Sequence, residues 1–508
     1  SKQVLHCNMN ANFCVLGSIC VFIYLWFNFP NALSLSKSKM APPYSSWAPF
    51  AFLWNSPSSS CAKHYSVPLD LSLFAAVSDP SNNVVKQNLT LFYDTRLGHY
   101  PYITEDKNET IKYNGAIPQN TTLRDHLRQA TVDITHYLPN KEAKGLAVID
   151  WEEWMPLWYR NTDKKKIYRK LSVEHLRRHN PTETFATIKE KAIIQFETAA
   201  REFMKKTLQL GKYLRPNQLW GFYMFPECYN HYRNENIQYT GKCTERDVSL
   251  NNKLIWLWEE STALYPSIYF TQHLSNTTSA ALFVRHRILE AMRVAELSKK
   301  PVPAPVYAYQ RLVFSDNTTA FLSQVDLIHS IGESAALGAA GIILWGASTM
   351  DSYLTSTLNP YIVNVTEATK LCSQILCHNN GRCIRKKLDS SDYLHLNPTN
   401  FHIQMNQHGQ FISTGVPSKA DLMYMVDKLG ASPPQGAPTH PHTRDNLESP
   451  MHLTCMSLDY GRKPTQTRGE HANSTQEGSV KQTKVFLLRG SSASTMPPCR
   501  PLKVLNIY

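Results

Sequence analysis

Two acidic side chains, Asp150 and Glu152, follow an apolar run in the segment GLAVIDWEEW, which begins at Gly145. Side chains two positions apart on a β-strand point to the same face. A buried carboxylate costs free energy unless it is paired or protonated, so acids are uncommon at the end of a buried strand. The spacing therefore predicts acid/base chemistry at a strand end. Glu153 points to the opposite face, where we expect it to be solvated or paired, and it is not assigned to the site.

The elements that must position this pair alternate between short apolar strands and longer amphipathic helices from about Phe50 to Asn364. One helix carries an apolar stripe at three- and four-residue steps, which is typical of packing on a sheet. This alternation predicts a parallel α/β sheet or barrel. The expected strands are residues 89–93, 145–151, 219–225, 303–309 and 341–345. The expected stripe is Phe185, Ile188, Ala192, Phe196, Ala199 and Phe203.

Several of the expected strands end in aromatic or acidic side chains, namely Tyr93, Asp150 with Glu152, Tyr223 and Trp345. In a TIM-type barrel the active site lies at the carboxyl ends of the strands. Each aromatic taken singly is explained by ordinary packing. Their joint occurrence at strand ends favours convergence on one cleft.

The chain has 508 residues, and 53 Lys and Arg against 40 Asp and Glu give a formal charge of +13. This charge favours an anionic partner, although a soluble basic protein of no special ligand also fits it. The basic residues are dispersed and no DNA- or RNA-binding motif occurs, so nucleic acid is not expected. An acidic polysaccharide or a membrane surface fits the charge equally well.

The first 34 residues predict a signal peptide or an N-terminal membrane anchor, because residues 13–29 form an almost continuous apolar run. Asn-X-Ser/Thr sequons agree with a secreted or cell-surface protein. No CxxC pair or HExxH motif occurs, so no metal site is expected. Cys228 and Cys243 bracket a polar loop that a disulfide would close. The sequons begin at Asn88, Asn108, Asn120, Asn276, Asn317, Asn364 and Asn473.

The composition of the sequence changes twice towards its end. The segment CSQILCHNNGRC, from Cys372, has the close cysteine spacing and Asn-Gly turn typical of an EGF-like module. Beyond about residue 430 the chain is rich in Pro, Ser, Thr, Gly and His and lacks hydrophobic periodicity, which predicts a disordered tail. His440 and His442 lie in this tail, where we expect them to be solvated rather than to bind a metal.

Several longer motifs follow one another along the chain, namely GLAVIDWEEW, LFYDTRLGHYP, LWGFYMFPECYN, WLWEESTALYPSIY, GESAALGAAGIILWG, NPYIVNVT and CSQILCHNNGRCIRK. With these motifs, the chain resembles the vertebrate hyaluronidases over roughly residues 45–425. It is most similar to the sperm-surface and chondroitin-preferring members. The resemblance implies a distorted TIM-like (β/α) barrel over residues 45–368, a truncated EGF-like module over 369–429 and the tail over 430–508.

The resemblance also implies an activity, which is endo-acting, retaining hydrolysis of the β-1,4 bonds between N-acetylhexosamine and glucuronate in hyaluronan or chondroitin, without a cofactor. Glu152 matches the family's proton donor and needs a pKa above the ~4.3 of a free glutamate. Burial against Trp151 and Trp345 and the charge of Asp150 would raise it. The substrate's own acetamido oxygen acts as the nucleophile in this family. Asp150 matches the residue that orients this amide, and Tyr223 helps to hold it.

Other matches to the family's cleft are Tyr93, Tyr269, Asp316 and Trp345, with Arg287 as a basic residue near the groove. Aromatic side chains there suit stacking on sugar faces. Met155 departs from the pattern, since close relatives carry an arginine that meets the substrate carboxylate, and methionine cannot make that contact. Leu157 and Thr162 likewise replace basic or aromatic residues.

Further departures concern Glu227, where the family usually has Asp, and cysteine pairing. The cysteine expected to pair with Cys61 is absent, and the later cysteines of the EGF-like module are missing, so the resemblance leaves Cys372 to pair with Cys383. These departures motivate an alternative to the enzyme, namely a catalytically weak or silent relative that binds glycosaminoglycan or a cell surface through the same groove.

Overall fold

The computed structural model describes residues 49–57, 69–80, 84–106, 109–231, 238–346, 351–379 and 381–432. These ranges do not include the expected leader over 1–34 or nearly all of the expected tail. They also do not include Cys61, Asn108 and Asn473. Within the described ranges, no helix is both long and apolar enough to cross a bilayer.

Parallel strands form the centre of the fold in two sheets, ordered β2-β1-β9-β8 and β3-β6-β7. Most of their residues are buried, as expected for parallel strands covered on both faces. The strands are β1 (Ala51–Asn55), β2 (Ala76–Ser78), β3 (Leu89–Tyr93), β6 (Gly145–Asp150), β7 (Gln218–Phe222), β8 (Tyr307–Gln310) and β9 (Gly341–Leu344).

The two sheets are joined at both edges. The irregular segment 264–267 bridges one edge, because Tyr265 pairs with Tyr223 after β7 and Ser267 pairs with Tyr309 in β8. At the other edge, the backbone N–H of Leu89 in β3 donates to Oγ of Ser78 in β2 over 3.2 Å. The strands therefore follow one another in the closed order that the predicted barrel requires.

Strand β8 begins later than the sequence pattern predicted, at Tyr307 rather than at residue 303. Pro303 and Pro305 lack the N–H groups that a ladder needs, so they are confined to the approach to the strand.

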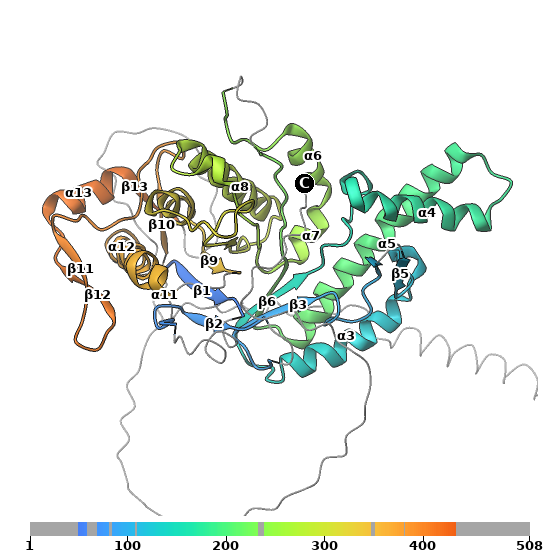
Figure 1. The fold of residues 1–508 in the computed structure, drawn as a ribbon, viewed down its shortest axis with the longest axis horizontal. Helices are drawn as coiled ribbons and strands as arrows, with labels where there is room; N and C mark the ends of the chain where they lie inside the picture. Colours follow the sequence, from blue (N-terminus) through green and yellow to red (C-terminus); the bar gives the residue numbers. More distant parts are fainter. Residues whose placement is uncertain are drawn as a thin grey trace, which may run out of the picture. The chain divides into compact units, whose positions relative to one another are not determined.

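Helices pack around the strands (Figure 1). They are α3 (Leu123–Tyr137), α4 (Lys166–His179), α5 (Phe185–Leu214), α6 (Glu245–Lys253), α7 (Ile255–Glu260), α8 (Thr278–Leu297), α9 (Gln324–Leu327), α10 (Glu333–Ala336), α11 (Asp351–Tyr353) and α12 (Asn359–Cys377). Short helical turns are η1 (Pro118–Asn120), η2 (Trp158–Arg160), η3 (Asp163–Lys165), η4 (Gln272–Leu274), η5 (Ile328–Gly332) and η6 (Leu354–Leu358).

The long helix α5 shows how the apolar stripe works. Ile188, Ala192, Phe196 and Phe203 are buried in the main core, as predicted. Phe185 is 64% exposed because it is the first residue of the helix, and Ala200 rather than Ala199 is the buried alanine of its turn. Thr184 caps the helix by accepting a hydrogen bond from the backbone N–H of Thr187.

The last described part of the chain forms smaller antiparallel sheets. Strand β10 (Arg382–Arg385) pairs with β13 (Leu429–Ser432), and β11 (Phe401–Met405) pairs with β12 (Phe411–Gly415). Helix α13 (Lys419–Lys428) lies between β12 and β13 in the chain. A disulfide joins Cys372 at the end of α12 to Cys383 in β10. A separate hairpin, β4 (Tyr102–Asp106) and β5 (Glu109–Tyr113), follows β3.

Candidate active site

The side chains at the carboxyl ends of neighbouring strands meet at one edge of the sheets. Tyr93 and Asp150 are register partners at the ends of β3 and β6. The backbone N–H of Tyr223, just after β7, donates to the carbonyl of Ile149 over 2.9 Å. Trp345 continues from β9. The parallel direction of the strands therefore places the predicted residues on the same edge.

Asp150 and Glu152 are close enough for their carboxyls to share a hydrogen bond, which requires one proton between them. Burial raises the pKa of Asp150 well above its usual value, and the charge of Glu152 adds to this. Burial also raises the pKa of Glu152. Oδ1 of Asp150 is buried and receives no hydrogen bond from an N–H or hydroxyl group of the described residues. The pair can therefore hold a proton and still accept a hydrogen bond from a ligand.

Tyrosines surround the pair. Tyr223 and Tyr269 are hydrogen-bonded to each other, and burial raises the pKa of both phenols, with the carboxylates Asp150 and Glu152 acting in the same direction. Burial likewise raises the pKa of Tyr93, whose hydroxyl is hydrogen-bonded to Trp345. These phenols stay protonated, so they can donate hydrogen bonds to a polar ligand.

Lys165 is a neighbour of the pair that sequence reasoning missed. It lies in η3, and its Nζ donates to the backbone carbonyl of Glu152. Its charge also opposes the rise in the pKa of Glu152 and of Glu153. The half-buried Glu153 thus has Lys165 as an electrostatic neighbour. No sequence signal distinguishes this lysine from Lys164 and Lys166 beside it.

Two of the expected cleft residues have their polar groups engaged within the protein. Arg287 donates from Nε to Asn230 over 2.9 Å and from a terminal nitrogen to the carbonyl of Ser267 over 2.9 Å, and burial lowers its pKa to about 10. Asp316 is exposed and accepts the backbone N–H of Gln272 over 2.8 Å.

Met155 lies in the core rather than on an open surface. Its side chain is 2% exposed, and its backbone N–H and carbonyl both bond to the side chain of Asn161 over 2.9 Å. Leu157 is also buried in the main core, whereas Thr162 is exposed. No cluster of three or more His, Cys, Asp or Glu suited to a metal occurs among the described residues.

Comparison with known proteins decides the family. A family model described as hyaluronidase matches residues 39–437. The chain belongs to the hyaluronidase family. It is 44% identical over 426 residues to hyaluronidase PH-20 of Homo sapiens, covering 82% of each chain. It is 46% identical over 402 residues to hyaluronidase-5 of Mus musculus, covering 77% of this chain and 76% of that one.

A solved structure of the hyaluronidase family shares this fold. The crystal structure of bee venom hyaluronidase in complex with a hyaluronic acid tetramer is 28% identical, with a TM-score of 0.54, and the match covers 62% of this chain and 98% of that one. The family resemblance inferred from the motifs is thereby confirmed.

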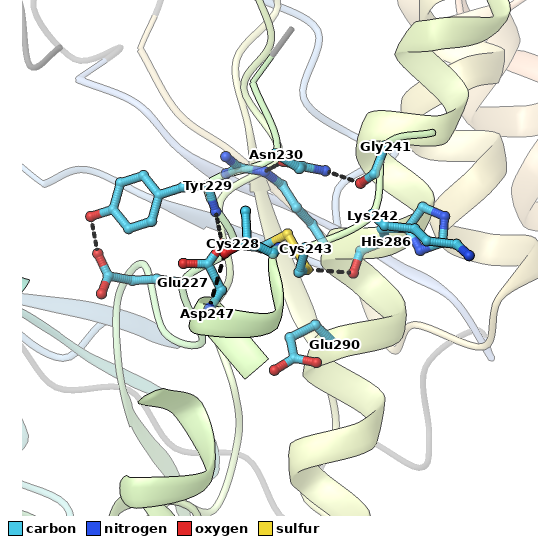
Figure 2. The surroundings of a disulfide bond; sticks show 12 residues. Glu227, Cys228, Tyr229, Asn230, Gly241, Lys242, Cys243, Asp247, His286 and Glu290 are labelled. Carbon is cyan, nitrogen blue, oxygen red and sulfur yellow. Dashed lines mark hydrogen bonds between the residues drawn. A yellow bond between two sulfur atoms is a disulfide. The ribbon is translucent and has the colours of Figure 1, made fainter. Parts of the chain in front are cut away.

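The hyaluronidase chain also contains a disulfide after β7, between Cys228 and Cys243, with 5.1 Å between their Cα atoms (Figure 2). Glu227, where the family usually has Asp, is 6% exposed and lies 3.2 Å from Nε of Arg160. A terminal nitrogen of Arg160 also lies 2.8 Å from Asp247. Glu227 therefore belongs to a buried ion cluster with Arg160 and Asp247, beside the disulfide.

Proposed function

We propose that this chain is an endo-acting retaining glycosidase that hydrolyses the β-1,4 bonds between N-acetylhexosamine and glucuronate in hyaluronan. The observation that carries the proposal is the buried pair of neighbouring carboxyl groups, Asp150 and Glu152, at the carboxyl end of β6 in a chain of the hyaluronidase family. The solved relative whose crystal holds a hyaluronic acid tetramer supports hyaluronan as the ligand. Chondroitin is a second substrate of the same chemical class.

In the proposed mechanism, Glu152 donates the shared proton to the glycosidic oxygen as the bond to the anomeric carbon breaks. Oδ1 of Asp150, which has no donor among the described residues, accepts the N–H of the substrate acetamido group and aligns its carbonyl oxygen. That oxygen attacks the anomeric carbon and forms a cyclic oxazolinium intermediate. Glu152 then takes a proton from water, and the resulting attack restores the acetamido group with retained configuration.

The surrounding aromatic side chains would hold the sugar. Tyr223 and Tyr269 can donate hydrogen bonds because their phenols stay protonated. Tyr93 and Trp345 present ring surface of the kind on which sugar faces stack. The two side chains are also neighbours, because Trp345 interacts with the Tyr93 hydroxyl.

We also propose that the protein is secreted or held at a cell surface. The disulfides Cys228–Cys243 and Cys372–Cys383 suit an oxidising compartment. Asn88, Asn120 and Asn276 are exposed and can accept a glycan, whereas Asn364 is half-buried within α12. The Cys372–Cys383 disulfide and the β10–β13 pair support a partial EGF-like module within residues 369–429, after a distorted TIM-like barrel over 45–368.

The direct test is to incubate the purified full chain with long hyaluronan and follow its size between about pH 4 and about pH 7.5, the span that shifted carboxylates cover. We expect a progressive fall in chain length and a new reducing end at N-acetylhexosamine. Binding without any cleavage across this range would contradict the enzyme and support the alternative, a silent relative that binds glycosaminoglycan.

The rate should fall as the pH rises through the raised pKa of the carboxyl pair. Burial favours the protonated forms of Asp150 and Glu152, so the pair keeps its shared proton at pH values where free carboxyls, with a pKa of about 4, have lost theirs. Once that proton is lost, Glu152 cannot protonate the leaving oxygen. The measurement is kcat as a function of pH. A fall in kcat centred at the pKa of a free carboxyl, about 4, would contradict this prediction.

A further inference from the structure

Arg311 lies on the same edge of the sheets as the candidate active site. It is the first residue after β8, and the backbone N–H of Trp345 donates to the carbonyl of the preceding residue, Gln310, over 3.0 Å. The guanidinium carbon lies 5.8 Å from the centre of the Trp345 ring. Its positive charge also acts on the phenol of Tyr269. Arg311 is thus a neighbour of two residues proposed to bind the sugar.

The guanidinium of Arg311 has hydrogen-bond donors to spare. Its Nε is buried and has no partner among the described residues. No carboxylate of the described residues lies within 4.0 Å of it. An arginine carries five N–H donors, and a buried donor without an acceptor costs free energy. A ligand that brings acceptors to this point would relieve that cost.

Four other half-buried or buried arginines have partners within the protein, although one terminal nitrogen of Arg160 has none among the described residues. Arg160 contacts Glu227 and Asp247, and Arg287 donates to Asn230 and to the carbonyl of Ser267. Arg285 and Arg385 share Glu333. Arg311 differs from these four arginines, because its guanidinium has no hydrogen-bond or ion-pair partner among the described residues.

We propose that Arg311 binds the carboxylate of the uronic acid next to the N-acetylhexosamine in the active site. This proposal rests on the proposed function, since it assumes a substrate in which the two sugars alternate. The planar fork of a guanidinium matches a carboxylate through two parallel hydrogen bonds. Met155 cannot supply such a contact, because its side chain is uncharged and 2% exposed. In this chain Arg311 would therefore make the contact with the uronic acid carboxylate that Met155 cannot make.

The test compares Arg311→Gln and Arg311→Lys with the unmodified full chain on hyaluronan oligosaccharides and on the same oligosaccharides with their carboxyl groups reduced to alcohols. We expect Arg311→Gln to raise KM for hyaluronan by roughly ten- to a hundredfold, the worth of one charge-assisted contact, with a smaller change in kcat. On the reduced substrate the two proteins should have equal KM. Arg311→Lys should keep part of the affinity, because it keeps the charge but loses the fork.

A matched control is Arg246→Gln, which removes one charge from an exposed position on α6 and should leave KM unchanged. Equal KM for hyaluronan in Arg311→Gln and the parent, or an equal loss on both substrates, would overturn the proposal. Binding of a hyaluronan hexasaccharide to Glu152→Gln and to Glu152→Gln with Arg311→Gln, measured by calorimetry, separates it from catalysis. If Arg311→Gln weakens hexasaccharide binding tenfold or more in the Glu152→Gln background, the assignment is supported even if the chain never cleaves hyaluronan. If neither protein binds the hexasaccharide, or if both bind it equally well, the assignment is overturned.

Discussion

Replacing Glu152 by glutamine is expected to lower kcat on hyaluronan by roughly 10²- to 10⁴-fold, the usual contribution of a general acid/base group. The substitution keeps the size of the side chain but removes the carboxyl group that donates the proton in the proposed mechanism. Without it the leaving oxygen departs unprotonated and water is not activated in the second step. The measurement is the rate of appearance of new reducing ends under saturating substrate.

The neighbouring Glu153→Gln variant is the matched control for this experiment. Glu153 is also half-buried and near Lys165, but the side-chain hydrogen bond of Asp150 is to Glu152 and not to Glu153. We expect its kcat to stay close to that of the parent, and Glu152→Gln should still bind hyaluronan oligosaccharides. Comparable losses in the two variants, or full activity in Glu152→Gln, would refute the assignment of Glu152 as the proton donor.

Asp150 and Glu152 could be found in the sequence because their chemistry depends on local spacing. An apolar run fixes the strand, and the parallel direction fixes the edge at which its last residue, Asp150, lies. Glu152 follows two residues after the strand ends. Tyr93 and Tyr223 follow from the same reasoning. Tyr269 does not, because the chain around it forms only isolated bridges instead of a patterned strand, and its place among the candidates came from the family resemblance.

Residues placed by tertiary contacts gave no usable sequence signal. Lys165 reaches the backbone of Glu152 only because η3 folds back on the strand end. In the sequence Arg311 cannot be distinguished from the many other dispersed basic residues. Only the structure shows that other arginines have carboxylate partners. Four of the six predicted residues of the α5 stripe are buried, since packing against a sheet follows the helical period, but Phe185 is exposed and Ala200 takes the place of Ala199. The start of β8 was predicted too early, because the prolines before it cannot join the ladder.

Sequence reasoning also could not pair charges across the fold, and the largest stability effect that we expect depends on such a pair. Glu333 in α10 is completely buried and lies 2.7 Å from Nε of Arg285 in α8. It also accepts hydrogen bonds from both terminal nitrogens of Arg385 in β10, the longer of them 3.0 Å. This carboxylate therefore links a helix of the main core to the last described part of the chain.

Replacing Glu333 by glutamine should lower the free energy of unfolding by about 3–5 kcal/mol, the usual cost of breaking a buried ion pair. The loss is large because Arg285 and Arg385 would both keep their charges in the interior without a carboxylate. The measurement is the urea midpoint of the purified full chain at constant pH. The control is Glu367→Gln, which breaks a 2.8 Å pair with Lys370 whose side chains are 42% and 49% exposed. Exposed pairs contribute at most about 1 kcal/mol, so equal midpoints for the two variants would show that burial does not set the strength of the Glu333 cluster.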